Sequence, residues 1–457
     1  MSALLLALTA TPPGFVQPGP ERPDPALGTL LHGLNQASLA RTIAWLADPD
    51  REGRGLGSRG LEAATARVEA HLRACELKRV TRQEVPLRKV TPGGGTLTLR
   101  LGSRAIALTH GKDALLPELE PQRLELPLVV APTGDVKALD VKGRAVLLPS
   151  PTQEALRELD ARGARLVLTQ EPDMARALRA YRPEPFFRAA EDPTLAEDLP
   201  RVRLASGVIP EGTETSGTVT LEVRATVEPS RGWNVLAQLP GRDPKADAVV
   251  IGAHLDHLGI RGGAVHPGAD DNASGVAALM EIARVMAPTR PRRTIVFAFW
   301  TGEEEGKFGS TRYVRDPRWP LDRTRAYLNL DMIGHPWTPS DFAALLKDTG
   351  TDPSALGPVD LKHFAEAGHA SWAPDLAPAL TRGARATGMT LRLDPGEGTT
   401  GGSDYRPFAR QRVPWVRFFG TFWPGYHSPQ DTADQLDTAQ VHRMARLILA
   451  TLWELSR

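Results

Sequence analysis

The stretch "RRTIVFAFWTGEEEGKFGS", residues 292–310, joins an apolar run to three consecutive glutamates. Because "TIVFAFW" does not alternate polar with apolar side chains, it predicts a strand that is buried on both faces of a sheet. Glu303, Glu304 and Glu305 follow directly, where the carboxyl end of such a strand would open toward a ligand. Adjacent carboxylates repel each other, so the stretch predicts a site where cations balance part of their charge.

Apolar strands of the same kind alternate with amphipathic helices through the second half of the chain. The helix expected from "ASGVAALMEIARVM", residues 273–286, repeats its apolar side chains every three or four positions. The alternation predicts an α/β fold with a mixed, mostly parallel sheet and helices on both faces. The other expected strands are "AVVIGA" (248–253), "AYLNL" (326–330) and "VPWVRFF" (413–419), and the expected closing helix is "TAQVHRMARLILATLWEL" (438–455).

The chain has 457 residues, more than one hydrophobic core usually holds, so two domains are expected. Short β-like runs such as "LPLVVAP" and "GRAVLLPS" indicate a small β-rich domain inserted at residues 91–225. The main domain then comprises residues 36–90 and 226–457. Residues 1–35 are expected to form a signal-like opening, "MSALLLALTA", and a proline-rich extended tether.

Composition excludes several classes of function. The net charge of +1 gives no large basic surface, so nucleic acid is not expected as a partner. The single cysteine, Cys75, cannot form an internal disulfide or a cysteine-based metal site, so any metal must use histidines and carboxylates. No later run reaches the ~20 apolar residues of a membrane span. The opening favours a secreted or periplasmic protein, with a cytoplasmic location as the alternative.

Polar residues recur where the predicted strands end. His254 and Asp256 follow "VVI", the pair Asp270 and Asp271 precedes a helix, and the later positions are Asp331 after "LNL" and His427 in "GYHSPQDT". Each motif alone is weak evidence, because such residues often cap helices or lie in solvated loops. Their recurrence at successive strand ends predicts a metal site for zinc foremost, with cobalt or manganese possible, and the many carboxylates favour two ions.

In this order, the motifs "GAHLDH", "GADDNASG", "TGEEEGKFGS", "LNLDMIG", "GGSDYRPF" and "YHSPQDT" resemble those of the di-zinc exopeptidase family. This family includes bacterial aminopeptidases, glutamate carboxypeptidases and glutaminyl cyclases. The loop "REGRGLGSRG" and the inserted segment are similar to members that carry a protease-associated domain. The resemblance implies the zinc exopeptidase fold and hydrolysis of peptides that have a free N-terminus.

The resemblance also implies a role for each motif residue. Two zinc ions would share Asp270, one completed by His254 and Asp331 and the other by Glu304 and His427. A water or hydroxide bridging the ions would be the nucleophile, with Glu303 as general base. Asp256 would hold the ring of His254, Tyr405 would stabilise the oxyanion, and Asp404 would bind or orient substrate. Glu305 matches no functional position and is expected to face solvent.

Other residues near the motifs have structural interpretations. His257, His266 and His335 are expected to be solvated or to support ligands, and Asp271 with Asn272 to shape the loop and cap the next helix. A hydrophobic substrate pocket could use Phe308, Trp337, Phe408, Phe422 and Trp423, although core packing is the more frequent role. The alternatives left open are a carboxypeptidase that uses Arg406 and Arg410, a glutaminyl cyclase and a catalytically silent binding protein.

Overall fold

A computed structural model describes residues 14–19, 23–117, 119–131, 136–180, 184–191, 199–208, 216–399 and 402–457. The chain divides into two compact units, one formed by residues 1–85 with 232–457 and the other by residues 86–231. The insertion predicted at 91–225 lies inside the second unit, and its identity as a protease-associated domain stays a prediction. The signal-like stretch 1–10 lies outside the described residues, so the expected export also stays a prediction.

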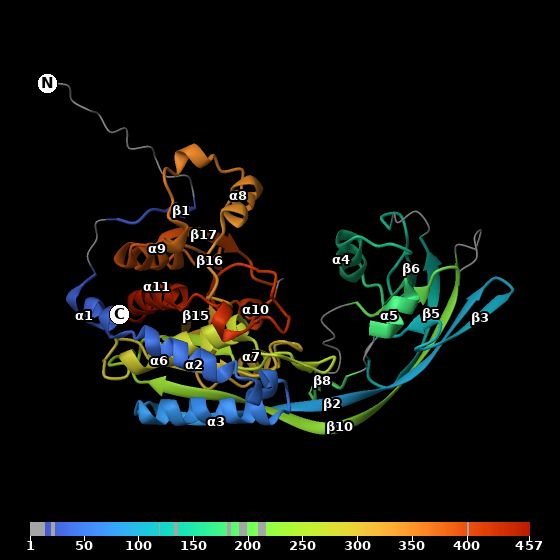
Figure 1. Cartoon of the computed structure of the whole chain (residues 1–457), viewed down its shortest axis with the longest axis horizontal. Coiled ribbons are helices and arrows are strands. Elements are labelled where there is room, and N and C mark those ends of the chain that lie inside the picture. Colours follow the sequence, from blue (N-terminus) through green and yellow to red (C-terminus); the bar gives the residue numbers. More distant parts are fainter. Residues whose placement is uncertain are drawn as a thin grey trace. The chain divides into compact units, whose positions relative to one another are not determined.

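The first unit is built on a mixed sheet (Figure 1). Its four central strands are parallel, and every residue of β11 and β14 is buried, which explains their unbroken apolar sequences. The strand order is β1 (Phe15–Val16), β17 (Thr390–Gly396), β16 (Phe364–Ala370), β18 (Trp415–Phe419), β15 (Thr324–Leu330), β11 (Ala248–His254), β14 (Ile295–Trp300) and β10 (Ser216–Leu239). Only residues 235–239 of β10 pair with β14.

The register brings the carboxyl ends of the central strands to one edge. His254 at the end of β11 lies opposite Trp300 at the end of β14, and Leu330 of β15 lies opposite Phe418 of β18. The loops that carry the predicted site residues therefore leave the sheet at neighbouring points. The predicted fold class, a mixed and mostly parallel sheet with helices, is confirmed for this unit.

Helices α6, α9 and α11 pack against the sheet, and α2 packs against α6 and α11. The predicted apolar face of α6 is buried, and so is that of α11, whose Val441, Met444, Ile448 and Leu452 have no exposed surface. Ser58 caps α3 by accepting the backbone N–H of Leu61. The bounds are α2 (Gln36–Leu46), α3 (Arg59–Ala74), α6 (Gly275–Met286), α9 (Leu376–Thr387) and α11 (Thr438–Ser456).

Helices α7 (Phe308–Arg315) and α10 (Tyr405–Arg410) pack on the strands through aromatic rings. Phe408 stacks on Tyr327 with 3.9 Å between ring centroids, and Tyr313 lies 5.1 Å from Trp300. Phe408 and Phe308, which we considered for a substrate pocket, are both buried. The remaining elements of this unit are β12 (Gly259–Arg261), β13 (Ala264–His266), α8 (Pro339–Asp348) and the short turns η1 (Pro49–Arg54), η2 (Ala269–Ser274), η3 (Leu321–Arg323), η4 (Pro353–Ala355), η5 (Leu361–His363) and η6 (Ala433–Gln435).

The segment expected to be an extended tether contains a helix, α1 (Pro25–Gly33). Asp24 caps it by accepting the backbone N–H of Leu27, and Pro25 occupies its first turn, where a missing N–H has no cost. Leu27, Leu30 and Leu31 are buried in the core. The many prolines indicated an extended segment, but Asp24 and Pro25 are also typical residues for the start of a helix. The expectation of a tether through residue 35 is therefore wrong for residues 25–33.

The second unit is β-rich and has two small hydrophobic cores. Strands β5, β6, β7 and β9 are parallel, and α4 packs Leu159 against Val146 and Val167. Its elements are the 86–101 part of β2 (Lys78–Leu101), β3 (Arg104–Thr109), β4 (Ala114–Leu115), β5 (Gln122–Val130), β6 (Ala145–Leu147), α4 (Gln153–Ala161), β7 (Leu166–Glu171), α5 (Met174–Ala180), β8 (Phe186–Ala189), β9 (Arg201–Ala205) and residues 216–231 of β10.

Side chains of the first unit join the two points where the chain leaves this unit, after residue 85, and re-enters it, at residue 232. Asn234 Nδ2 donates to Gln83 Oε1 at 3.0 Å and to the carbonyl of Gly309 at 2.9 Å. Gln83 Nε2 donates in turn to the carbonyl of Asp316. The ends of this unit at residues 85 and 232 are thus tied to each other and to α7.

Among the described residues, the helices are all too short or too polar to cross a bilayer.

Candidate metal centre

Five side chains from different loops of the first unit converge at the carboxyl edge of its sheet. His254 ends β11, Glu304 follows β14 and Asp331 follows β15, while Asp271 lies in η2 and His427 follows β18. All five were among the residues singled out from the sequence. The structure therefore brings together the motifs that strand-end recurrence predicted.

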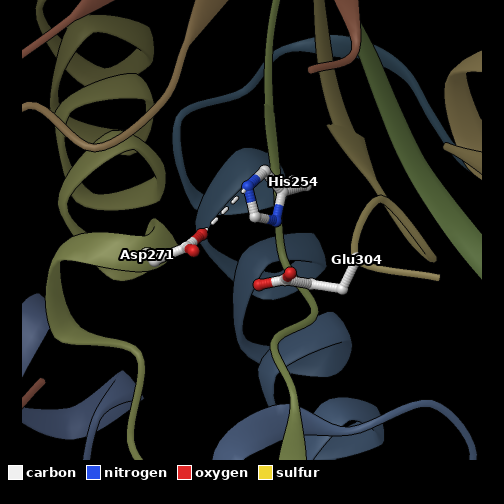
Figure 2. Close-up of side chains that lie close together, drawn as sticks. All are labelled: His254, Asp271 and Glu304. Carbon is white, nitrogen blue, oxygen red and sulfur yellow. Dashed lines mark ion pairs between the residues drawn. The ribbon is translucent and has the colours of Figure 1, made fainter. Parts of the chain in front are cut away.

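Asp271 lies between the two histidines. Its Oδ1 is 3.4 Å from His254 Nε2, and its Oδ2 is 3.1 Å from His427 Nε2. Asp331 Oδ1 lies 3.3 Å from the same nitrogen of His254, and Glu304 Oε2 lies 3.2 Å from His427 Nε2. Figure 2 shows the Asp271 and Glu304 carboxylates turned toward His254, and one donor atom from each of these three residues lies within 4.8 Å of the others.

This geometry divides the donors into two sets that share one carboxylate. His254, Asp331 and one oxygen of Asp271 form the first set, and His427, Glu304 and the other oxygen form the second. Imidazole nitrogens with carboxylate oxygens are a donor set that zinc accepts, and three protein ligands leave a coordination position open. The described residues therefore fit zinc.

Asp270, the predicted shared ligand, does not point into this cluster. Its Oδ1 accepts the backbone N–H of Gly334, and its Oδ2 lies 4.0 Å from His335 Nε2. Asp271, for which we expected only a loop-shaping role, occupies the shared position instead. Asn272 does cap the following helix, because its Oδ1 accepts the backbone N–H of Gly275.

Asp256 supports the site differently from the expected way. His254 Nδ1 lies 3.2 Å from the backbone carbonyl of Asp256, not from its carboxylate. The carboxylate instead accepts the backbone N–H groups of Glu303 and Glu304 at 3.2 and 3.3 Å. Asp256 therefore orients His254 through its main chain and fixes the glutamate loop through its side chain.

His257 and Asp431 are further supports inside the protein. His257 Nδ1 lies 2.6 Å from Glu304 Oε1, and its side chain has no exposed surface. Asp431 accepts the backbone N–H of Asp270 at 2.8 Å and of Asp271 at 3.1 Å. His257 thus fixes the orientation of the Glu304 carboxylate, and Asp431 fixes the loop that carries Asp271. Of the other neighbouring histidines, His266 is buried with Nδ1 near the carbonyl of Ala264.

A buried chain of hydrogen bonds ends on Asp331. The Trp300 indole donates to the Tyr327 hydroxyl, which donates to Asn329 Oδ1, each at 2.8 Å. Asn329 Nδ2 donates to Ser403 Oγ at 2.9 Å, and Ser403 donates to Asp331 Oδ2 at 2.6 Å. One oxygen of Asp331 is therefore satisfied by protein, which turns the other toward His254.

The electrostatics reflect the density of acidic groups. Burial, with the nearby Glu304, raises the pKa of Asp271 to about 6. Burial would lower the pKa of His427, but its contacts with Asp271 and Glu304 raise it to about 10. Burial likewise opposes ionisation of Glu304, yet His257 and His427 hold its pKa well below the ordinary value. The buried carboxylates are thus balanced by positive histidine charge, a role that a bound divalent cation would take over.

Glu303 has a different environment from its neighbour. Its Oε1 lies 3.5 Å from Lys307 Nζ and accepts no hydrogen bond from the described residues. Burial, reinforced by Asp404 and Glu304, raises the pKa of Glu303 well above its ordinary value, although Lys307 and His254 act in the opposite direction. A buried carboxyl with a raised pKa and an unsatisfied oxygen suits proton transfer.

Asp404 and Tyr405 lie at the start of α10. Asp404 is fully buried and accepts the Ser310 hydroxyl at 2.5 Å, and burial raises its pKa to about 7. This agrees better with ordering the loop than with direct contact with substrate. Tyr405 is 5% exposed and stacks on Trp415, so its donation to an oxyanion stays a prediction.

Comparison with known proteins finds a family model that matches the second half of the chain. The family model described as peptidase family M28 matches residues 234–452, which include all five converging side chains. The likeness to peptidase family M28 thus covers residues 234–452. The matched region contains both the sheet edge and the cluster of converging side chains.

Individual relatives agree with this assignment. The chain is 28% identical over 245 residues to leucine aminopeptidase 2 of Arthroderma otae, covering 50% of this chain and 46% of that protein. It is 29% identical over 293 residues to a probable zinc metalloprotease of Pyrenophora tritici-repentis, covering 56% and 59%. The chain thus spans about half the length of the curated relatives it matches.

The fold also matches solved structures. An aminopeptidase from Aneurinibacillus sp. strain AM-1 superposes with a TM-score of 0.61 at 20% identity, covering 94% of this chain and 96% of the other. A zinc aminopeptidase from Bacillus subtilis gives a TM-score of 0.55 at 21% identity, covering 92% and 95%. At this identity the likeness establishes a shared fold.

Proposed function

We propose that this protein is a zinc-dependent aminopeptidase that binds two zinc ions per chain and removes N-terminal residues from peptides. The observation that carries the proposal is Asp271, which faces His254 with one oxygen and His427 with the other. Each histidine has a further carboxylate, Asp331 or Glu304, so each ion would have three protein ligands. The named activities of the relatives are consistent with this function.

Different residues would have different roles in amide hydrolysis. Bound zinc supplies the Lewis acidity that activates water and polarises the substrate carbonyl. Glu303 takes the proton from the attacking water and delivers it to the leaving amine, for which its raised pKa and unsatisfied oxygen are suited. His257 and Ser403 hold Glu304 and Asp331 in place. Tyr405 would donate to the developing oxyanion.

A panel of aminoacyl anilides with free amines tests the proposal. Metal-loaded protein should cleave at least some of them, chelator should abolish cleavage, and added zinc should restore it. Zinc content measured in the same preparation should approach two per chain. Failure to hydrolyse any free-amine substrate while two zinc ions are bound would overturn the proposal.

Blocked dipeptides separate this function from carboxypeptidase action. An aminopeptidase cleaves a dipeptide with a blocked C-terminus and leaves one with a blocked N-terminus intact. A carboxypeptidase shows the reverse pattern, and a glutaminyl cyclase releases a cyclised product without hydrolysis. Only the first pattern is compatible with the proposed activity.

A further inference from the structure

Arg54 is a fully buried arginine in the loop "REGRGLGSRG", between α2 and α3. The chemistry proposed above does not use this residue. A buried guanidinium is costly unless all of its N–H groups are satisfied. The identity of its partners therefore indicates what the residue does.

The partners of Arg54 are backbone carbonyl oxygens at five points of the chain. Five N–H donors in a rigid planar group can meet five acceptors, which the three donors of a lysine cannot. The contacts are Nε to Leu255 at 2.9 Å, Nη1 to Leu46 and Pro267 at 2.7 Å each, and Nη2 to Gly268 at 2.7 Å and Asp271 at 3.5 Å.

Four of these five carbonyls belong to segments that carry the site. Leu255 lies between His254 and Asp256, on the segment that leaves β11. Pro267, Gly268 and Asp271 itself belong to the segment that enters η2. One side chain therefore joins the two segments whose histidine and aspartate lie 3.4 Å apart.

Asp431 completes the attachment of the second segment. Its carboxylate accepts the N–H of Asp271, while Arg54 contacts the carbonyl of the same residue. The main chain at Asp271 is thus held on both sides by buried groups of opposite charge. The carbonyl of Arg54 also accepts the N–H of His257, so the loop contacts the first segment twice.

The loop packs closely against the backbone of Gly259 and His266. A Cβ atom on Gly53, whose φ is +58°, would lie 2.3 Å from the carbonyl oxygen of His266 and 2.6 Å from that of Gly259. A Cβ on Gly55 would lie 2.8 Å from Gly259 Cα. Such close backbone approach explains both glycines and fixes the point from which Arg54 reaches the carbonyls.

We propose that Arg54 is a positioning residue that sets the zinc affinity of the site by fixing the spacing between the His254 and Asp271 segments. The inference rests on the proposed function, since it concerns the same zinc site. Supporting groups of this kind are typically worth ~10- to 100-fold in metal affinity. Arg54 does so without contacting a ligand side chain, through main-chain carbonyls alone.

The test compares zinc affinity in Arg54→Met, Arg54→Lys and a matched control, Arg51→Met. Arg51 lies in the same loop but stacks on Trp45 and pairs with Asp50. Competition with a chromophoric zinc chelator should show binding weakened ~10- to 100-fold in Arg54→Met and less in Arg54→Lys. Arg51→Met should remain within about twofold of wild type.

Two further measurements distinguish an effect of Arg54 on ligand position from a general loss of protein stability. The thermal midpoint of each metal-free variant shows whether it is folded, and the visible spectrum of the cobalt-loaded protein reports the ligand geometry. A changed cobalt spectrum with a folded metal-free protein supports the inference. If Arg54→Met does not fold, Arg54→Lys carries the test alone.

Wild-type zinc affinity in a folded Arg54→Met protein, or in Arg54→Lys if only that variant folds, would overturn the inference while leaving the proposed function intact. Failure of the wild-type protein to bind zinc would overturn both. Equal weakening in the Arg51→Met control would also contradict the inference, because the effect would then belong to the whole loop and not to the five carbonyl contacts.

Discussion

Glu303, Glu304 and Glu305 are consecutive carboxylates with three different sets of neighbours. Glu303 faces Lys307, and Glu304 contacts both His257 and His427. Glu305 lies 3.4 Å from Arg261, and the Glu305 side chain is 13% exposed. Glu305 is thus paired and largely covered, not turned fully into solvent as expected. Repulsion within the run is relieved because each carboxylate has its own positive partner.

These neighbours predict a separation of effects among three alanine variants. Glu304→Ala should lose zinc, since it removes a ligand, and Glu303→Ala should retain zinc but lose activity by about 100-fold or more. Glu305→Ala should retain both. Zinc content and anilide hydrolysis measured on the same three preparations check the ranking, and zinc loss in Glu303→Ala would contradict it.

Asp270 and Asp271 provide a second comparison at this scale. Asp271→Asn removes the charge shared by both histidines and should weaken zinc binding ~10-fold or more. Asp270→Asn keeps an oxygen for the N–H of Gly334 and should leave zinc affinity within about threefold. Chelator competition measures both, and the reverse order would restore Asp270 as the shared ligand.

The sequence predicted which motifs meet but not every residue within them. His254, Glu304, Asp331 and His427 could be selected because the resemblance to the di-zinc exopeptidases assigned a ligand role to each of these motif positions. Asp270 and Asp271 are neighbours of the same type, and only the path of the chain through η2 decides which of them faces the histidines. Arg54 and Asp431 act on backbone groups brought together by the fold, so sequence spacing gave no signal for their role.

At the scale of the element, two glycines near helix starts predict opposite effects. Gly28 lies within α1 with no atom within 4 Å of an added Cβ, whereas an added Cβ on Gly60 at the start of α3 would lie 1.6 Å from the carbonyl oxygen of Arg51. Gly28→Ala should raise the free energy of unfolding by about 0.5–1 kcal/mol. Gly60→Ala should lower it by about 3 kcal/mol. Denaturant unfolding of both variants measures the difference, and destabilisation by Gly28→Ala would contradict the open environment.

The cap of α1 gives a pH dependence. Burial opposes ionisation of Asp24, but the N–H of Leu27, the Trp453 indole and Arg457 lower its pKa below the ordinary value of 3.8. Because the folded-state pKa is the lower one, the stabilisation is present above 3.8 and is lost as the pH falls through the folded value. Asp24→Ala should cost ~1 kcal/mol at pH 7.

Unfolding of wild type and Asp24→Ala at several pH values tests this dependence. The difference between the two proteins should shrink below about pH 4, as the carboxylate takes up a proton. A difference that stays constant down to pH 2 would show that the side chain acts through packing and not through its charge.

The buried central strands could be predicted from their sequences. β11 and β14 are buried on both faces, and their unbroken apolar runs can hardly be interpreted otherwise. The boundaries of the insertion were harder to predict. Strand β2 continues through the boundary after Val85, and β10 continues through the boundary after Arg231. A continuous strand gives no break in composition at which to place a boundary.

For the whole molecule, the location of the site in one unit predicts how zinc affects unfolding. Zinc at 100 times its Kd should stabilise the first unit by about 2.7 kcal/mol, since it binds only the folded site. We expect calorimetry to show two transitions, with chelator lowering the midpoint of one. Equal shifts of both transitions would mean that the units unfold together.

The hydrogen bond between Gln83 and Asn234 has a consequence for modularity. Residues 86–231 are inserted between two parts of the first unit, which ends at residue 85 and resumes at residue 232. Side chains of the first unit already join the chain near these two points. Replacing this segment with a short turn would close a loop between neighbouring points, at little cost in chain entropy. The first unit should therefore remain folded after residues 86–231 are removed, so this segment can be deleted or exchanged as a module.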